Sequence, residues 1–260
     1  MDDWTEEIVS VDGTGVQLLK GGAGKPLLVL HGEEGNPGWL RYQRALAERY
    51  QVYAPSHPGF GGSDRPDWLE TMGDMACFYS WLLEEMGLDC VPVVGFSMGG
   101  WLAAEIAVSC PHAFSRLVLV GASGIKPVEG EIADIFIMSP QQIVEKSFFD
   151  PQQSPEYEEL YGREATPELV ESRTRDREMA VRLGWKPYMH DLRLPSLLRR
   201  VRIPSLVVWG RQDAIVPLEC GGLYQKAIPG STLKILENCG HSPQIEKPGK
   251  LVEAALQFLA

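Results

Sequence analysis

Strand-length apolar runs alternate with stretches of helical periodicity along most of this 260-residue chain. Continuous apolar runs predict strands that are buried on both faces, and they lie at 26–30, 91–95, 117–120 and 204–209. Apolar positions spaced by three or four residues predict helices, and these lie at 39–50, 71–86, 98–109, 218–228 and 249–259. Buried strands that alternate with helices indicate βαβ units, hence a mostly parallel α/β sheet with helices on both faces.

Weaker signals add further strands to this sheet. Two β-rich stretches at 7–11 and 16–20 are separated by Asp12-Gly13, a pair of residues typical of tight turns. Strands are also expected at 51–55 and 233–236. Residues 56–66 are rich in glycine and proline, so we expect a loop there.

The alternation of strands and helices stops in the middle of the chain. Between residues 124 and 200 there is no buried-strand run, and the sequence is charged, helical in character and interrupted by seven prolines. We therefore predict one α/β core in two parts, 1–123 and 201–260, with a mostly helical cap or lid formed by 124–200.

Composition narrows the class of partner. The chain is 44% hydrophobic and carries a formal net charge of −11, with a sequence pI of about 5.0. This acidity disfavours nucleic acid and anionic membrane surfaces as partners. The five cysteines are scattered without a CxxC pair, which indicates neither a disulfide framework nor a zinc site. Residues 1–7 are acidic and no apolar run is long enough to insert stably in a membrane, so we expect a cytoplasmic protein.

A serine between two glycines is the first candidate for chemistry. Gly95-Phe96-Ser97-Met98-Gly99 follows a predicted buried strand and begins a predicted helix. A sharp strand-to-helix turn would lift the hydroxyl of Ser97 above the sheet edge, and the small glycines would allow close approach of neighbouring backbone. The N-terminus of the helix would favour negative charge at the same place. Such a turn can also be purely structural, so Ser97 needs partners.

A base and an acid follow the serine at the ends of later predicted strands. His241 comes directly after the strand at 233–236, whereas His112 and His190 fall in less suitable places, a helix end and the predicted cap. Asp213 follows the strand at 204–209. Because parallel strands end at the same sheet edge, His241 is expected near Ser97 as base, with Asp213 orienting it.

Backbone donors for an oxyanion are expected from two loops. Met98 follows the serine, and Glu33 lies in the loop after the strand at 26–30, where Gly32 permits the N–H to point inward. His31 is expected to form a supporting hydrogen bond rather than to act as base. The direction of the Glu33 side chain cannot be predicted from the sequence.

Two further features lie in the predicted cap. Its charged stretch at 171–182 is interpreted as a solvated helix face. Its aromatic residues are expected to line an apolar pocket or to pack the cap onto the core, and they include Phe148, Phe149, Tyr157, Trp185 and Tyr188.

Taken together, these motifs resemble those of the α/β-hydrolase superfamily, in its capped, carboxylesterase-like branch. The resemblance extends over nearly the whole chain and implies a core sheet of about eight strands, no cofactor and no metal. It assigns the triad roles to Ser97, Asp213 and His241. The segments that carry it are Leu30-His31-Gly32, the run from Ser56 to Pro66, Val94 to Gly100, Trp209-Gly210 with Asp213 and Val216-Pro217, and Gly240-His241-Ser242-Pro243.

Departures from related families restrict the chemistry. The Pro58-to-Asp64 run is shared with haloalkane dehalogenases and epoxide hydrolases, whose nucleophile is aspartate, but this position is Ser97. Ring-fission carbon–carbon hydrolases usually carry asparagine before the serine and tryptophan shortly after the Gly-His pair. Phe96 and Pro243-Gln244 stand there instead, which disfavours that reaction without excluding it.

The leading hypothesis is hydrolysis of a carboxylic ester through an acyl-enzyme intermediate on Ser97. Carbon–carbon or thioester hydrolysis with the same residues is the alternative, and a ligand-binding receptor on the same fold is a third hypothesis from another class. The expected partner is a small-molecule ester with an apolar part. Whether the chain forms a homodimer is left open by the sequence.

Overall fold

The computed structural model describes residues 4–162 and 165–260, so the first three residues of the acidic stretch 1–7 lie outside it. A single eight-stranded sheet has the strand order β1-β2-β4-β3-β5-β6-β7-β8. The strands are β1 Trp4–Val11, β2 Thr14–Gly21, β3 Pro26–Leu30, β4 Gln51–Pro55, β5 Val91–Phe96, β6 Phe114–Val120, β7 Ser205–Gly210 and β8 Thr232–Leu236.

Most of this sheet is parallel, as the sequence predicted. β1 pairs with β2, and β2 with β4, in antiparallel register, whereas β4, β3, β5, β6, β7 and β8 run parallel to one another. The β1–β2 hairpin turns at Asp12 and Gly13, both with positive φ. Since the parallel strands all end at the same edge, the loops after β3, β5, β7 and β8 gather there, and these loops carry the candidate residues.

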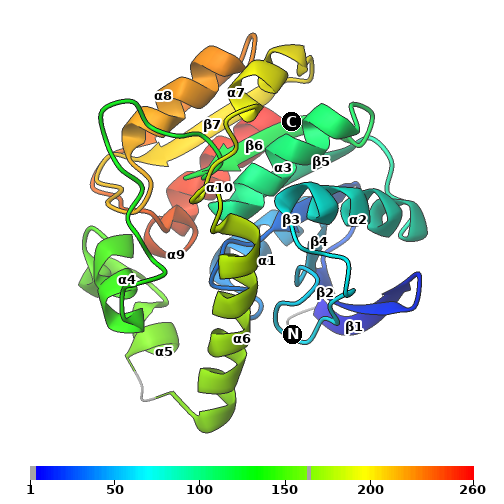
Figure 1. Ribbon diagram of the computed structural model, residues 1–260, viewed down its shortest axis with the longest axis horizontal. Helices are drawn as coiled ribbons and strands as arrows, with labels where there is room; N and C mark the ends of the chain where they lie inside the picture. Colours follow the sequence, from blue (N-terminus) through cyan, green and yellow to red (C-terminus); the bar gives the residue numbers. More distant parts are fainter. Residues whose placement is uncertain (1–3, 163–164) are drawn as a thin grey trace.

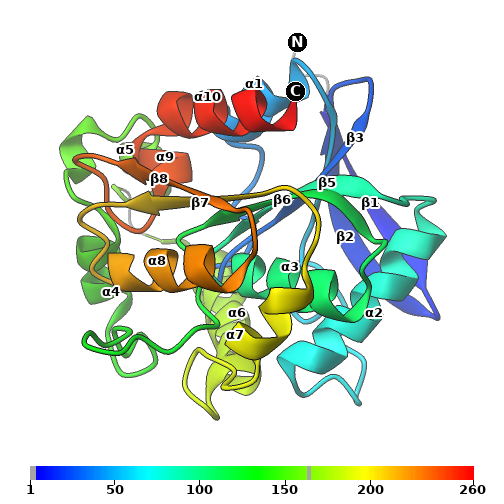
Figure 2. The ribbon, with the colours of Figure 1, turned by 90° about the horizontal axis from the view of Figure 1, so that it is seen from above.

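Helices cover both faces of the sheet (Figure 2), with α1, α9 and α10 on one face and α2, α3 and α8 on the other. Between the sheet and these helices lie two clusters of buried apolar side chains, one on each face of the sheet. The helices are α1 Arg41–Ala47, α2 Met72–Glu85, α3 Met98–Ser109, α8 Leu218–Ala227, α9 Pro243–Glu246 and α10 Pro248–Leu259. Among the described residues, no helix is both long enough and apolar enough to cross a membrane.

Residues 124–200, which we call the inserted segment, join β6 to β7. In Figure 1, α4, α5 and α6 lie together beyond the edge of the sheet that carries the loops after β3, β5, β7 and β8. The segment contains α4 Pro140–Ser147, η1 Pro151–Gln153, α5 Tyr157–Tyr161, α6 Pro167–Gly184, α7 Leu194–Leu197 and η2 Leu198–Arg200.

The expectation that 171–182 is only a solvated face is wrong for one side of α6. Met179 and Ala180 are buried, and the buried Asp176 accepts a 2.7 Å hydrogen bond from the backbone N–H of Gly61. Gly35, with φ of +79°, packs so tightly on this carboxylate that a Cβ there would lie 2.4 Å from an Asp176 oxygen. A charged helix face therefore docks the inserted segment onto two loops of the core, because its aspartate satisfies a backbone donor there.

Element bounds differ from the predicted ones mainly where the pattern mixes polar and apolar positions. The first helix begins at Arg41 rather than 39, since Leu40 has extended backbone and its N–H is bonded by the side chain of Gln43. β6 begins at Phe114 rather than 117, because Phe114 and Arg116 pair with β5. Ser115 and Arg116 are only half-buried, so no continuous apolar run marks this part of the strand.

Candidate active site

Ser97 lies on a strained turn between β5 and α3. Its backbone has φ of 47° and ψ of −115°, a region that costs non-glycine residues about 1–3 kcal/mol. The glycines around it are required by close contacts: a Cβ at Gly95 would lie 2.4 Å from the carbonyl oxygen of Gly99, and one at Gly99 would lie 2.2 Å from that of His31. The turn is thus held by backbone packing, and it presents the serine hydroxyl at the sheet edge.

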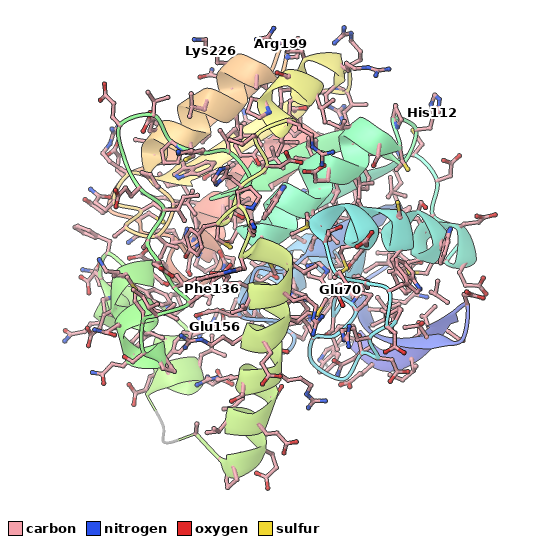
Figure 3. The ribbon with its side chains drawn as sticks, in the orientation of Figure 1. Glu70, His112, Phe136, Glu156, Arg199 and Lys226 are labelled. Atoms are coloured by element: carbon pink, nitrogen blue, oxygen red, sulfur yellow. The ribbon has the colours of Figure 1, made fainter. Side chains whose placement is uncertain are left out.

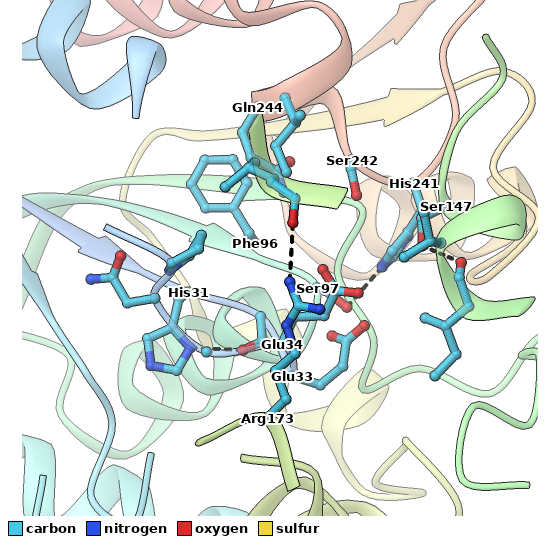
Figure 4. A pocket seen from close by; sticks show the side chains of 18 of the residues that line it. His31, Glu33, Glu34, Phe96, Ser97, Ser147, Arg173, His241, Ser242 and Gln244 are labelled. Atoms are coloured by element: carbon cyan, nitrogen blue, oxygen red, sulfur yellow. Dashed lines mark hydrogen bonds between the residues drawn. The ribbon is translucent and has the colours of Figure 1, made fainter. Parts of the chain in front are cut away.

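His241 joins Ser97 to Asp213. Its Nε2 lies 2.9 Å from the Oγ of Ser97, a contact drawn as a dashed line in Figure 4. Its Nδ1 lies 2.8 Å from the Oδ2 of Asp213. The carboxylate accepts the proton on Nδ1, so in the neutral ring Nε2 is left free to accept the serine proton. The structure therefore brings together the three residues that the sequence selected as nucleophile, base and acid.

Asp213 is held in place by backbone donors. Its Oδ1 accepts hydrogen bonds of 2.9 Å from the N–H groups of Ile215 and Val216, and its side chain is completely buried. These bonds leave Oδ2 for His241. The negative charge is stabilised by three donors, which fixes both its position and that of the imidazole.

Negative groups around His241 control its basicity. Burial by itself would lower the pKa of the imidazole, but the charge and hydrogen bond of Asp213, with further attraction from Glu33 and Glu34, raise it to about 9. A base with a raised pKa accepts the serine proton readily once it is itself unprotonated.

Two backbone N–H groups border the serine without a protein acceptor. Among the described residues, neither the N–H of Met98 nor that of Glu33 has a hydrogen-bond partner. The loop that carries Glu33 adjoins the nucleophile, since a Cβ at Gly32 would lie 3.2 Å from the Cβ of Ser97. The residues that the sequence selected as oxyanion donors therefore lie beside the hydroxyl.

His31 supports the loop that carries Gly32 and Glu33, and it is not part of the hydrogen-bond chain of Ser97. Its Nδ1 lies 2.7 Å from the carbonyl oxygen of Gly32, and its Nε2 accepts a 2.8 Å hydrogen bond from the backbone N–H of His57. The ring of His57 in turn bonds the hydroxyl of Tyr79. Burial lowers the pKa of His31 to about 4, so this imidazole stays neutral and braces the loop.

The remaining histidines are away from the serine. His112 is exposed at the periphery of the molecule, close to the end of α3 (Figure 3), and His190 lies in the inserted segment, where its Nδ1 is 2.7 Å from the carbonyl oxygen of Tyr188.

A cavity of about 180 Å³ opens over Ser97 between the core and the inserted segment. None of the five aromatic residues named from the sequence lines it: Phe148 is buried against the core, and Phe149 and Trp185 are largely exposed. Its apolar wall instead comes from other residues of the inserted segment, chiefly Ile135, Phe136, Pro140, Ile143, Val144, Leu160 and Tyr161.

Sequence reasoning missed the contacts that tie the His241 loop to the inserted segment. The carbonyl oxygen of Ser147 accepts the backbone N–H of His241 at 2.8 Å. The buried carboxylate of Glu246 accepts three backbone N–H groups, from Gly240 at 2.6 Å and from Phe149 and Asp150 at 2.9 and 2.8 Å. The only sequence signal was a glutamate five residues after the histidine, which carries no indication of its partners.

Comparison with known proteins agrees with this architecture. Residues 27–255 match the model of the alpha/beta hydrolase family, so the chain belongs to that family. One similar protein is the dihydrolipoyllysine-residue acetyltransferase component of the acetoin cleaving system of Cupriavidus necator, 31% identical over 93% of this chain, which spans only 65% of that relative's length. Another is the 2-hydroxy-6-oxo-2,4-heptadienoate hydrolase of Pseudomonas putida, 27% identical over 97% of this chain and 95% of the relative.

Solved structures of several enzymes share the fold. The 2-hydroxy-6-oxo-6-phenylhexa-2,4-dienoate hydrolase of a Rhodococcus strain superimposes with a TM-score of 0.80 at 23% identity, covering 99% of both chains. An esterase from Rhodococcus gives a TM-score of 0.76 at 24% identity, covering 99% of this chain and 98% of its own. At these identities the similarity establishes the fold alone.

Proposed function

We propose that this protein is a serine hydrolase that cleaves carboxylic esters through an acyl-enzyme on Ser97. The observation that carries the proposal is the continuous hydrogen-bond chain from Ser97 through His241 to Asp213, at 2.9 and 2.8 Å. A serine hydroxyl is a weak nucleophile unless an oriented base removes its proton, and this arrangement supplies both base and orienting acid.

In the first half-reaction, Ser97 attacks the ester carbonyl while His241 Nε2 takes the hydroxyl proton. The N–H groups of Met98 and Glu33 hold the negative oxygen of the tetrahedral intermediate. The bond to the alcohol oxygen then breaks, and His241 gives its proton to the departing alcohol. Asp213 stabilises the charged imidazole throughout.

In the second half-reaction, water attacks the acyl group on Ser97 while His241 accepts one of its protons. The same two N–H groups hold the second oxyanion. The bond to Oγ breaks, His241 returns the proton to Ser97, and the carboxylic acid leaves. No residue changes its net protonation over the cycle.

The inserted segment acts as a cap over the substrate in this proposal. Its apolar side chains, among them Phe136 and Ile143, supply most of the cavity wall that faces Ser97. An apolar wall and a volume of about 180 Å³ suit a small ester with an apolar acyl or alcohol part.

Hydrolysis of a carbon–carbon bond is a second candidate, favoured by the names of relatives that act on 2-hydroxy-6-oxo dienoates. Phe96 and Gln244, which line the cavity, are departures from the residues usual in that group. The two candidates are separated by comparing kcat/KM for 4-nitrophenyl butyrate and for 2-hydroxy-6-oxo-6-phenylhexa-2,4-dienoate. We expect the ester to be preferred. A strong preference for the dienoate would contradict the proposal of ester hydrolysis and support carbon–carbon hydrolysis as the function.

A further inference from the structure

A buried carboxylate oxygen without a hydrogen-bond partner belongs to a residue that lines the cavity beside the nucleophile. Glu33 is only 9% exposed, it lines the cavity with Ser97 and His241 (Figure 4), and its Oε2 has no hydrogen-bond partner among the described residues. Its backbone N–H is assigned to the oxyanion, and its side chain enters the proposed mechanism only as one of the negative charges that raise the pKa of His241. A buried acceptor without a donor is costly, which makes this oxygen a candidate to meet a donor on a ligand.

Nearby cations do not neutralise this carboxylate. Arg173 and Arg177 also line the cavity, yet among the described residues no ion pair joins either to Glu33 within 4.0 Å. Arg177 instead donates to the carbonyl oxygens of Ile135, Phe136 and Met138, and Arg173 donates to that of Leu160 while its guanidinium lies over the ring of Tyr161.

The neighbouring Glu34 provides a contrast. Its Oε2 accepts a 3.0 Å hydrogen bond from the hydroxyl of Tyr161, and the residue is exposed although it also lines the cavity. A second orphan acceptor, the Oε1 of Gln244, also lines the cavity. Two residues of the cavity wall, Glu33 and Gln244, therefore carry a buried acceptor oxygen that no described donor satisfies.

We propose that the Glu33 carboxylate is a specificity site for a hydrogen-bond-donating group of the substrate, either a protonated amine or a hydroxyl, held within the cavity close to the scissile carbonyl. The inference rests on the proposed ester hydrolysis and names a substrate class for it. Substrates with an anionic group at the same place are rejected, because a second negative charge would meet the buried carboxylate.

The test is a set of isosteric esters assayed with the full-length protein. Benzyl butyrates carry a meta aminomethyl, hydroxymethyl, methyl or carboxylate group, and butyl benzoates carry the same groups on the acyl side. In at least one series, kcat/KM is expected to be about 10-fold or more higher for the aminomethyl or hydroxymethyl ester than for the methyl ester, and lowest for the carboxylate. Comparing amine with hydroxyl identifies which donor is preferred.

The matched variants are Glu33→Gln and Glu34→Gln, both of which keep the backbone N–H and the side-chain shape. Glu33→Gln is expected to reduce the donor-to-methyl ratio to within about 3-fold of unity, whereas Glu34→Gln keeps the larger part of it. If the wild-type ratio is near unity in both series, or if Glu33→Gln leaves it unchanged, a water molecule rather than substrate satisfies Glu33 and the proposal is overturned.

A binding measurement separates this proposal from ester hydrolysis itself. Calorimetric titration of the Ser97→Ala protein with benzylamine, benzyl alcohol and benzoate needs no turnover. Binding of benzylamine or benzyl alcohol that weakens about 10-fold in the Ser97→Ala, Glu33→Gln double variant supports the site even if no ester is cleaved. Equal affinity in the two proteins, or stronger binding of benzoate, overturns the site even if esters are cleaved.

Discussion

The backbone N–H of His241 donates a 2.8 Å hydrogen bond to the carbonyl oxygen of Ser147, the last residue of α4. The loop that carries the proposed base is therefore bonded directly to the inserted segment, through backbone atoms that no substitution of Ser147 removes. The same contact surface includes Gly240, where a Cβ would lie 2.5 Å from the Ser147 carbonyl oxygen. We therefore expect changes in the inserted segment to alter the position of the imidazole.

Glu246 reinforces this attachment, so its loss is expected to affect rate as well as stability. Glu246→Gln replaces an acceptor-only carboxylate that meets three backbone N–H groups, and it turns an amide donor toward one of them. We expect a loss of about 1–3 kcal/mol in the free energy of unfolding by urea. Because the His241 loop loosens, kcat is expected to fall with little change in KM.

The control for this variant is Glu237→Gln. Glu237 pairs with Arg211 on the surface and its side chain is 59% exposed, so its loss is expected to change the free energy of unfolding by less than about 0.5 kcal/mol. Equal effects of the two substitutions on kcat would show that the attachment does not position His241.

Removing the charge of Asp213 tests the orientation of the base. Asp213→Asn keeps the shape but presents an amide where the carboxylate accepted the Nδ1 proton, which favours the wrong imidazole tautomer. A fall of about 10³–10⁴-fold in kcat is expected for ester hydrolysis. Thermal unfolding monitors the fold in parallel; a folded variant with more than a tenth of the wild-type kcat would remove Asp213 from the mechanism.

The pH dependence of kcat/KM follows from the raised pKa of His241. General base catalysis requires the neutral ring, so activity is expected to be low below the pKa of the free enzyme and to rise to a plateau above it. With a pKa of about 9, the half-maximal value falls near pH 9. Glu34→Gln removes one negative charge near the ring and is expected to move the midpoint to lower pH. An unchanged or raised midpoint would contradict this electrostatic account.

The tight turn at Ser97 predicts a sharp difference between two glycines. Gly95→Ala places a Cβ 2.4 Å from a backbone oxygen, and a loss of about 1–3 kcal/mol or more in the free energy of unfolding is expected. Gly222→Ala, within α8 where a Cβ meets nothing within 4 Å, is expected to be neutral or to stabilise by up to about 1 kcal/mol. Urea denaturation of both variants checks the contrast, and similar losses would contradict it.

Local pattern was enough to predict the sheet and the proposed triad. Ser97 and Asp213 each follow a buried apolar run, and His241 follows the weaker strand signal at 233–236. Because the ends of parallel strands lie at one edge, residues that are distant along the chain were expected to lie close together. Gly95 and Gly99 were identified for the same reason, because the turn restricts which residues fit. These inferences depend only on strand order and short-range geometry.

The docking of the inserted segment onto the core could not be predicted in this way, although its helical character was. Asp176 bonds a backbone N–H 115 positions earlier, and Glu246 bonds two that lie 97 and 96 positions earlier. Such contacts depend on how helices dock, which no local periodicity encodes. The choice between a pocket-lining and a packing role for the cap aromatics was left open for the same reason: Phe136 and Ile143 line the cavity, whereas the more conspicuous Trp185 is 57% exposed.

The most direct test of the central claim is the fate of Ser97 itself. The protein is treated with a fluorophosphonate, and intact mass and peptide mapping are compared for the wild type and Ser97→Ala, alongside hydrolysis of 4-nitrophenyl butyrate. We predict a single adduct on Ser97, complete loss of esterase activity on labelling, and a fall of more than about 10³-fold in kcat for Ser97→Ala. An unlabelled serine, or a folded Ser97→Ala protein that hydrolyses the ester at the wild-type rate, would contradict the account.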